Sequence, residues 1–110
     1  MKTKLSLIPL LLILAACGTL GVPAPQTFNQ RAAAATASVN TASQTVLTLL
    51  KARKITPDES DRYTDRTEDA QDAIDLARSI YAANPTEAED RLTATITALK
   101  ILTAELERRK

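Results

Sequence analysis

The chain has 110 residues, with 14 Lys and Arg against 13 Asp and Glu, no His, no Trp and one Cys. This length supports one small domain. The near-neutral balance provides no basic stripe of the kind that binds nucleic acid, so no nucleic-acid partner is expected. Without His, and with a single Cys, the usual nucleophile–base pairs and zinc sites cannot be assembled. We therefore expect no enzyme, no metal site and no cofactor.

The N-terminal segment has the three parts of a secretory signal. Lys2 and Lys4 precede the apolar run Leu5–Leu14, and small residues follow it. A transmembrane helix requires roughly 20 apolar residues, whereas this run is shorter and contains Pro9. The pattern predicts a signal peptide over residues 1–16.

The end of this segment, Leu14-Ala15-Ala16-Cys17, resembles the lipobox of bacterial lipoproteins. The resemblance implies cleavage between Ala16 and Cys17, a diacylglyceryl group on the Cys17 sulfur, acylation of the freed amine, and a membrane anchor through this lipid. Gly18 is not aspartate, which in lipoproteins of the enteric type implies transfer to the outer membrane, facing the periplasm. An ordinary cleaved signal, or an uncleaved anchor, is the alternative interpretation.

The lipidated Cys17 and the segment after it, together residues 17–26, are expected to form a flexible tether. Gly18–Gln26 contains two prolines and two glycines, which prevent regular structure. Loss of the signal peptide leaves 12 basic and 13 acidic residues, a net charge of −1. Both glycines of the chain lie in this tether, so the remaining sequence lacks the residue that tight β-hairpins favour and points to helices.

Three helix starts are marked in residues 27–110. Capping-box patterns, with a hydroxyl or amide at the N-cap and Gln or Glu three residues later, occur at Thr27-Phe28-Asn29-Gln30, Thr56-Pro57-Asp58-Glu59 and Asn84-Pro85-Thr86-Glu87. Two of them place Pro at the first helical position, where its missing N–H costs nothing. The patterns predict helices over about 28–54, 57–83 and 85–109. Short connections make neighbouring helices antiparallel, so we predict an all-α, up-down-up three-helix bundle whose C-terminus lies far from the lipid.

Apolar residues alternate spacings of four and three along each helix, which is the pattern of nearly parallel packed helices. The predicted core positions are Phe28, Ala32, Ala35, Val39, Ala42, Val46 and Leu49 in the first helix; Tyr63, Thr67, Ala70, Ile74, Ala77 and Tyr81 in the second; and Ala88, Leu92, Thr95, Ile96, Leu99, Leu102 and Leu106 in the third.

The surface of the first helix lacks charge from Ala32 to Leu50, although a solvent-facing helix ordinarily carries Lys and Glu. Small neutral side chains let another backbone approach closely. We predict a contact face including Asn40, Ser43 and Thr48, for self-association or for an unknown envelope protein. The alternative is an alanine-rich helix of good intrinsic propensity.

The C-terminal Glu107-Arg108-Arg109-Lys110 resembles the basic, lysine-terminated end of the major murein lipoproteins, whose final lysine is joined to peptidoglycan. The overall layout is also similar to that of small helical lipoproteins of Gram-negative bacteria and their prophages. The expected function is a lipid-anchored, periplasm-facing binding module of the cell envelope. The alternative is a structural tether linked to, or contacting, peptidoglycan through Lys110.

Overall fold

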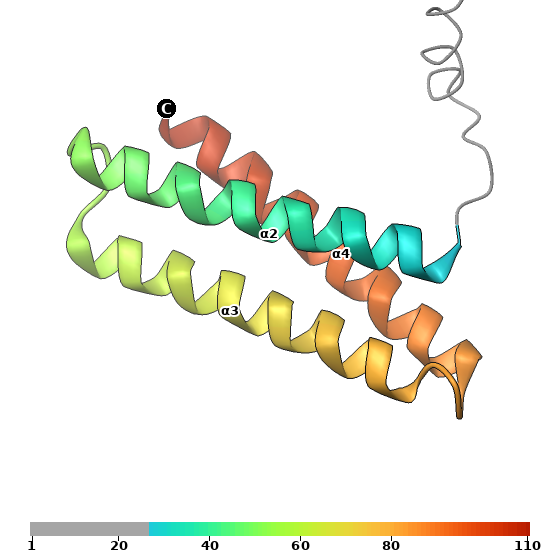
Figure 1. The fold of residues 1–110 in the computed structure, drawn as a ribbon. Helices are drawn as coiled ribbons and strands as arrows, with labels where there is room; N and C mark the ends of the chain where they lie inside the picture. Colours follow the sequence, from blue (N-terminus) through green and yellow to red (C-terminus); the bar gives the residue numbers. More distant parts are fainter. Residues whose placement is uncertain (1–26) are drawn as a thin grey trace, which may run out of the picture.

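The computed structural model describes residues 27–110, which form three helices and no strand (Figure 1). The helices are α2 (Phe28–Lys51), α3 (Pro57–Ile80) and α4 (Pro85–Arg109). The predicted all-α three-helix bundle is confirmed. The predicted signal peptide, the tether and Cys17 lie outside the described residues.

Two of the three predicted capping boxes are complete. The Thr27 hydroxyl accepts a hydrogen bond from the Gln30 backbone N–H at 3.1 Å. In return, the side-chain amide oxygen of Gln30 accepts one from the Thr27 backbone N–H at 3.0 Å. Thr56 and Glu59 form the same reciprocal pair at the start of α3, at 3.1 and 2.9 Å. At α4 only the first half forms: Asn84 accepts the Glu87 N–H at 3.1 Å, while the Glu87 carboxylate pairs with Arg91.

Two helices end three residues earlier than predicted. α2 stops at Lys51 because Arg53 adopts a left-handed conformation, with φ of 60°, and the Lys54 N–H returns to the Leu49 carbonyl at 2.9 Å. This is the usual helix-terminating geometry, for which glycine is the common residue. α3 stops at Ile80, whose carbonyl accepts the Asn84 N–H at 2.8 Å. The predicted ends at 54 and 83 are therefore wrong.

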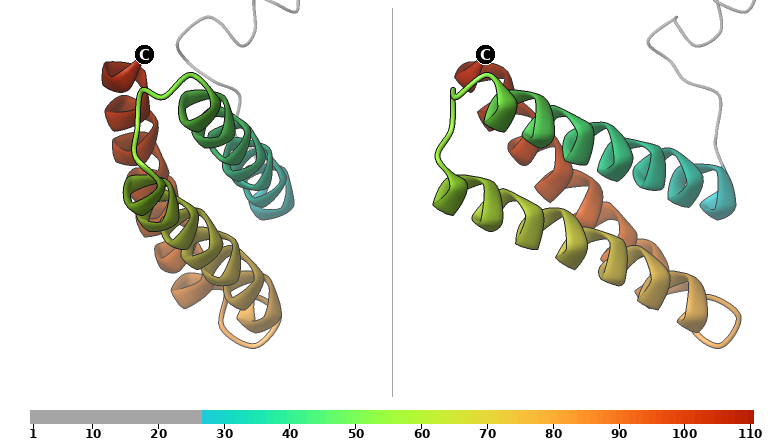
Figure 2. Two further views of the ribbon diagram at one scale, coloured as in Figure 1. Left: turned by 90° about the vertical axis from the view of Figure 1, so that its left-hand side faces the viewer. Right: turned by 60° about the vertical axis from the view of Figure 1, so that its left-hand side comes forward.

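The three helices run up, down and up, with α4 inclined across the other two (Figures 1 and 2). The end of α4 returns to the end of α2, where the Lys54 ammonium donates to the backbone carbonyl of Lys110. Lys110 therefore lies at the opposite end of the bundle from Thr27, where the chain enters it, as predicted.

The core follows the predicted apolar stripes except at three positions. All seven predicted positions of α2 are buried, and so are six of the seven in α4, with Ile96 packed against the core at its edge. In α3, Tyr63 is half-buried and Tyr81 is 38% exposed. Tyr81 falls in the turn, where its ring stacks on that of Phe28 with centroids 4.3 Å apart. Ile55, buried in the α2–α3 turn, was not predicted.

Candidate contact surface between α2 and α4

A groove of about 760 Å³ runs between α2 and α4 on the side of the bundle away from α3. The buried side chains of Ala35 and Leu99 form its floor. Its walls and ends are formed by Arg31, Ala34, Ser38, Thr93, Ile96, Thr97, Lys100, Thr103 and Ala104. We call this the α2–α4 groove.

The groove is open because small side chains make up most of both walls, although Ile96 and Lys100 also line it. Ala34 and Ser38 are one helical turn apart on α2, as Thr93 and Thr97 are on α4. The Thr97 hydroxyl donates to the Thr93 carbonyl at 3.1 Å. Because this intrahelical bond satisfies the hydroxyl proton of Thr97, that proton requires no partner from a molecule bound in the groove.

An ion pair closes one end of the α2–α4 groove. The Arg31 guanidinium pairs with the Glu89 carboxylate and donates to the Thr93 hydroxyl at 2.8 Å. The two charged side chains are 26% and 39% exposed, so the pair contributes at most about 1 kcal/mol to stability. It connects α2 to α4 at this end of the groove.

A second groove, of about 370 Å³, continues along the same side of α2 toward the C-terminal end of the bundle. It is lined by Thr41, Gln44, Thr45, Thr48, Leu49, Ala52, Lys54 and Lys110. The Thr45 hydroxyl donates to the Thr41 carbonyl at 2.9 Å, which satisfies the hydroxyl proton of Thr45 within the helix. Together the two grooves border α2 from Arg31 to Ala52.

The three residues predicted to form a contact face do not lie along one groove. Thr48 lines the second groove, whereas Asn40 and Ser43 line neither of the two. At about 100° per residue, Ser43 and Thr48 point roughly 140° apart around α2. Asn40 is exposed and Ser43 is half-buried, so neither is a core position, and Asn40 points between Ser43 and Thr48.

The α4 wall of the α2–α4 groove was not predicted from the sequence. Thr93, Thr97 and Ala104 supply it. These three uncharged positions are spaced by four and then seven residues, which places them on one face of the helix. The same spacing occurs on the surface of any threonine-rich helix, so it does not by itself indicate a groove. Only the packing angle between α2 and α4 shows that these positions face a groove.

Two ion pairs join α3 to α4 on the other side of the bundle. Arg66 donates to both carboxylate oxygens of Glu105, at 2.8 and 3.3 Å. This pairing raises the pKa of Arg66 and lowers that of Glu105. At the start of α3, the Thr56 N–H and then the Arg109 guanidinium hold the pKa of Glu59 below its ordinary value.

The acidic side chains of α3 lie on its solvent side. Each of them is exposed, namely Asp58, Asp61, Asp65, Glu68, Asp69, Asp72 and Asp75. In residues 27–110 no three His, Cys, Asp or Glu side chains are grouped so as to hold a metal ion. None of the three described helices contains an apolar stretch long enough to cross a bilayer.

Comparison of the chain with family models, with curated proteins and with solved structures found no match.

Proposed function

We propose that the chain is a lipid-anchored, periplasm-facing interaction module in the envelope of a Gram-negative bacterium, with the α2–α4 groove as its contact surface. The observation that carries the proposal is that small Ala, Ser and Thr side chains make up most of the lining of this groove, with Arg31 and Lys100 as its charged members, in a bundle whose α3 surface is heavily charged. The anchor is the Leu14-Ala15-Ala16-Cys17 sequence, with the lipid on Cys17.

Helix packing is the interaction that this lining favours. Side chains such as Ala34 and Ser38 keep the groove walls low, so another helix can approach closely and bury the partly exposed Ile96. The occupant is a second copy of the chain or a helix of an envelope protein, and the two give different products in a crosslinking experiment.

Crosslinking in cells tests the contact surface. A photoreactive residue placed at Ser38, in the α2–α4 groove, should form one discrete product, of dimer mass or of the mass of a partner. The same residue placed at Asp72, on the exposed side of α3, is the matched control and should form none. Equal products at both positions, or none at Ser38, would contradict the proposed surface.

Membrane fractionation tests the anchor separately. Cys17→Ser removes the sulfur that would carry the diacylglyceryl group, so the protein should stay uncleaved or leave the outer membrane. Several acyl chains hold a protein far more firmly than one, at about 0.8 kcal/mol per buried CH₂. An unchanged mass together with unchanged outer-membrane fractionation would show that the lipoprotein assignment is wrong.

A structural tether is the second candidate function. The observation in its favour is the position of Lys110, exposed at the end of the bundle opposite Thr27, with its side chain 52% exposed. A covalent link there would join peptidoglycan to the membrane across the length of the bundle. Lysozyme digestion of purified cell walls would then release protein carrying a muropeptide on Lys110, and release of unmodified protein alone would exclude the link.

A further inference from the structure

The fold gathers half of the basic residues of the described chain at one end. Residues 27–110 contain 12 Lys and Arg, and six of them come from two segments that the chain brings together. We call this cluster the basic tip; it consists of Lys51, Arg53, Lys54, Arg108, Arg109 and Lys110. The hydrogen bond from the Lys54 ammonium to the Lys110 carbonyl joins the two segments across 56 positions of sequence.

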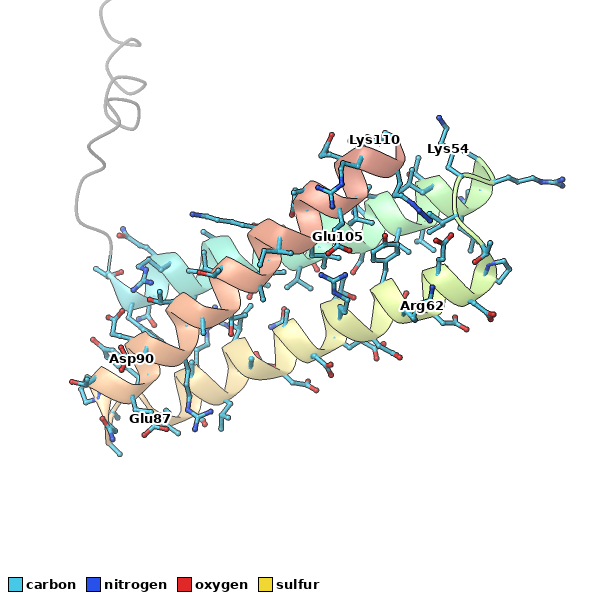
Figure 3. The ribbon with its side chains drawn as sticks, turned by 180° about the vertical axis from the view of Figure 1, so that it is seen from behind. Lys54, Arg62, Glu87, Asp90, Glu105 and Lys110 are labelled. Atoms are coloured by element: carbon cyan, nitrogen blue, oxygen red, sulfur yellow. The ribbon has the colours of Figure 1, made fainter. Side chains whose placement is uncertain are left out.

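The molecule is polarised along its length. Figure 3 shows Lys54 and Lys110 together at one end and Glu87 and Asp90 at the other. The chain enters the bundle at Thr27, at the end that holds Glu87 and Asp90, where Arg31 and Arg91 pair with Glu89 and Glu87. At about 1.5 Å per residue, the 24 residues of α2 place the basic tip roughly 36 Å away from that entry.

Four of the six cations are free of ion pairs within the described residues. Arg109 pairs with Glu59 across the bundle, and Lys110 pairs with Glu107 at 2.9 Å on the surface. The other four tip residues, Lys51, Arg53, Lys54 and Arg108, form none. Asp58 and Asp61, both exposed at the start of α3, are the remaining acidic side chains at this end.

Arg53 lies in the turn between α2 and α3, in a conformation that favours glycine. Its φ is 60°, and its N–H donates to the Leu50 carbonyl at 3.0 Å. A non-glycine residue in this region carries a steric cost. Arg53→Gly therefore removes a cation from the tip and at the same time removes the steric cost of the left-handed backbone. A loss of binding in this variant would not come from a loss of stability.

We propose that the basic tip docks end-on against an anionic phospholipid bilayer. The tip bears separate point charges, and segments 51–56 and 107–110 hold no aromatic side chain on which a base could stack. A nucleic acid lying along the bundle would meet the acidic side of α3. A flat bilayer meets only the tip, and its anionic lipids can diffuse to lie beneath the cations.

Combined with a lipid anchor at Cys17, docking of the basic tip would let the protein connect two membranes. This bridging role rests on the proposed function, because it requires the anchor. An N-terminal lipid in one membrane and a basic tip about 36 Å from Thr27 together allow the bundle to bridge two surfaces. The docking step itself requires only the described residues.

A vesicle-capture experiment tests the proposal with the full protein extracted from the membranes of producing cells. The protein is first incorporated into neutral phosphatidylcholine vesicles, and flotation shows whether it is anchored. Labelled acceptor vesicles are then added, containing either phosphatidylcholine alone or 30% phosphatidylglycerol. Capture should require phosphatidylglycerol and should fall steeply when salt is raised from 50 to 300 mM, because surface electrostatics are screened.

Two matched double variants distinguish an effect of the basic tip from an effect of the net charge of the protein. Arg53→Gln with Arg108→Gln should lower capture about 25-fold, since each cation at an anionic surface contributes about fivefold. Arg78→Gln with Arg91→Gln makes the same chemical change elsewhere on the bundle and should leave capture within about twofold of wild type. Arg53→Gly should lower capture about fivefold while the unfolding temperature stays the same or rises, which excludes misfolding as the cause.

Several results would overturn the proposal. Equal loss in both double variants would show that only net charge matters. Absence of capture by protein that floats with its donor vesicles would show that the tip does not bind bilayers. Tip-dependent pelleting with purified cell walls, without vesicle capture, would assign the tip to a wall polymer. Protein that fails to float contradicts the anchor instead, and direct mixing with the acceptor vesicles then tests the tip alone.

Discussion

α2 and α3 are built alike inside the bundle and differently outside it. Each has 24 residues, and each begins at a Thr N-cap with a complete capping box. The surface of α3 carries eight acidic residues and three arginines, whereas α2 carries only Arg31 and Lys51. The two helices therefore share their buried apolar positions and their N-caps, while the residues on their exposed surfaces differ.

The difference also bears on what stabilises each helix. Two ion pairs connect α3 to α4, through Arg66–Glu105 and Arg109–Glu59, and one connects α2 to α4. α2 therefore depends more on its fully buried stripe and on its alanine content. Four predictions test this comparison, in order of decreasing effect on stability.

The largest effect is expected in the shared core. Ile74 in α3 is fully buried and Leu99 in α4 is 3% exposed, so replacing either by Ala should lower the free energy of unfolding by about 2–5 kcal/mol. The measurement is urea unfolding of the segment Gln26–Lys110, followed by circular dichroism. Leu76→Ala, at an exposed position of α3, is the control, with an expected change within about 0.5 kcal/mol. A non-cooperative transition, or indifference to Ile74→Ala, would show that the helices do not pack on one another.

The core was predictable because apolar residues at alternating spacings of four and three lie on one face of an α-helix, which must then be buried. The seven positions of α2 follow it without interruption, and all are buried. Prediction failed where the helix stopped: Tyr81 continues the period but lies in the turn after Ile80. The end of α2 was missed because no glycine marks it, since Arg53 takes the left-handed position.

The surfaces were less predictable because they depend on packing rather than on period. The neutral stretch of α2 was evident from the sequence, but the direction of its groove follows from how α4 is inclined against α2. For that reason Thr48 lies in a groove and Asn40 does not. The basic tip likewise needs α4 to return beside the α2–α3 turn, a closure that joins Lys54 to Lys110.

The next effect is expected at the two complete capping boxes. Thr27→Ala and Thr56→Ala each remove the side chain that accepts an N–H at the third helical position. Each should lower the free energy of unfolding by about 0.5–2 kcal/mol. Thr48→Ala, at an exposed position inside α2, should be neutral or slightly stabilising because Ala favours helix. Equal effects at all three positions would mean that the caps contribute no more than any other surface threonine.

A smaller effect, dependent on pH, separates the two capping boxes. Glu59 in the α3 box has a pKa lowered by the Thr56 N–H and by Arg109, whereas Gln30 in the α2 box does not titrate. A carboxylate with a lowered folded-state pKa stabilises the protein above its unfolded-state pKa of about 4.3. That stability is lost as pH falls through the folded-state pKa. Glu59→Gln keeps the hydrogen-bond acceptor and should therefore reduce the loss of stability between pH 7 and pH 3.

The reciprocal exchange makes this test sharper. Gln30→Glu gives the α2 box a carboxylate that accepts from the Thr27 N–H at the helix start, and it should increase the loss of stability on acidification. Glu105, whose pKa is lowered by Arg66, supplies a background acid dependence common to all variants. Urea unfolding at pH 7 and pH 3 provides the comparison. The same pH dependence of the free energy of unfolding in both variants and in wild type would show that ionisation of the residue at position 30 or 59 does not affect the stability of the capping boxes.

The smallest effect on stability, and the largest on association, is expected on the surface of α2. Asn40→Lys and Thr48→Lys both alter exposed positions, so each should change the free energy of unfolding by no more than about 0.5 kcal/mol. Their positions differ, since Thr48 lines the second groove, whereas Asn40, about 80° away around the helix, lines neither groove. A lysine ammonium buried without a partner in an interface costs several kcal/mol. Thr48→Lys should therefore abolish a contact made along the grooves, and Asn40→Lys should leave it intact.

Sedimentation of the segment Gln26–Lys110 measures self-association, and crosslinking in cells measures binding to another protein. Loss of association in Thr48→Lys alone would place the contact on the groove side of α2. Loss in Asn40→Lys alone would move it to the α3 flank, next to Ser43, and would leave the grooves without a role. If wild type is monomeric and neither variant changes the crosslinks, α2 has no contact surface. Its uncharged exterior then reflects only the helix propensity of alanine and a bundle whose solubility depends on the charges of α3.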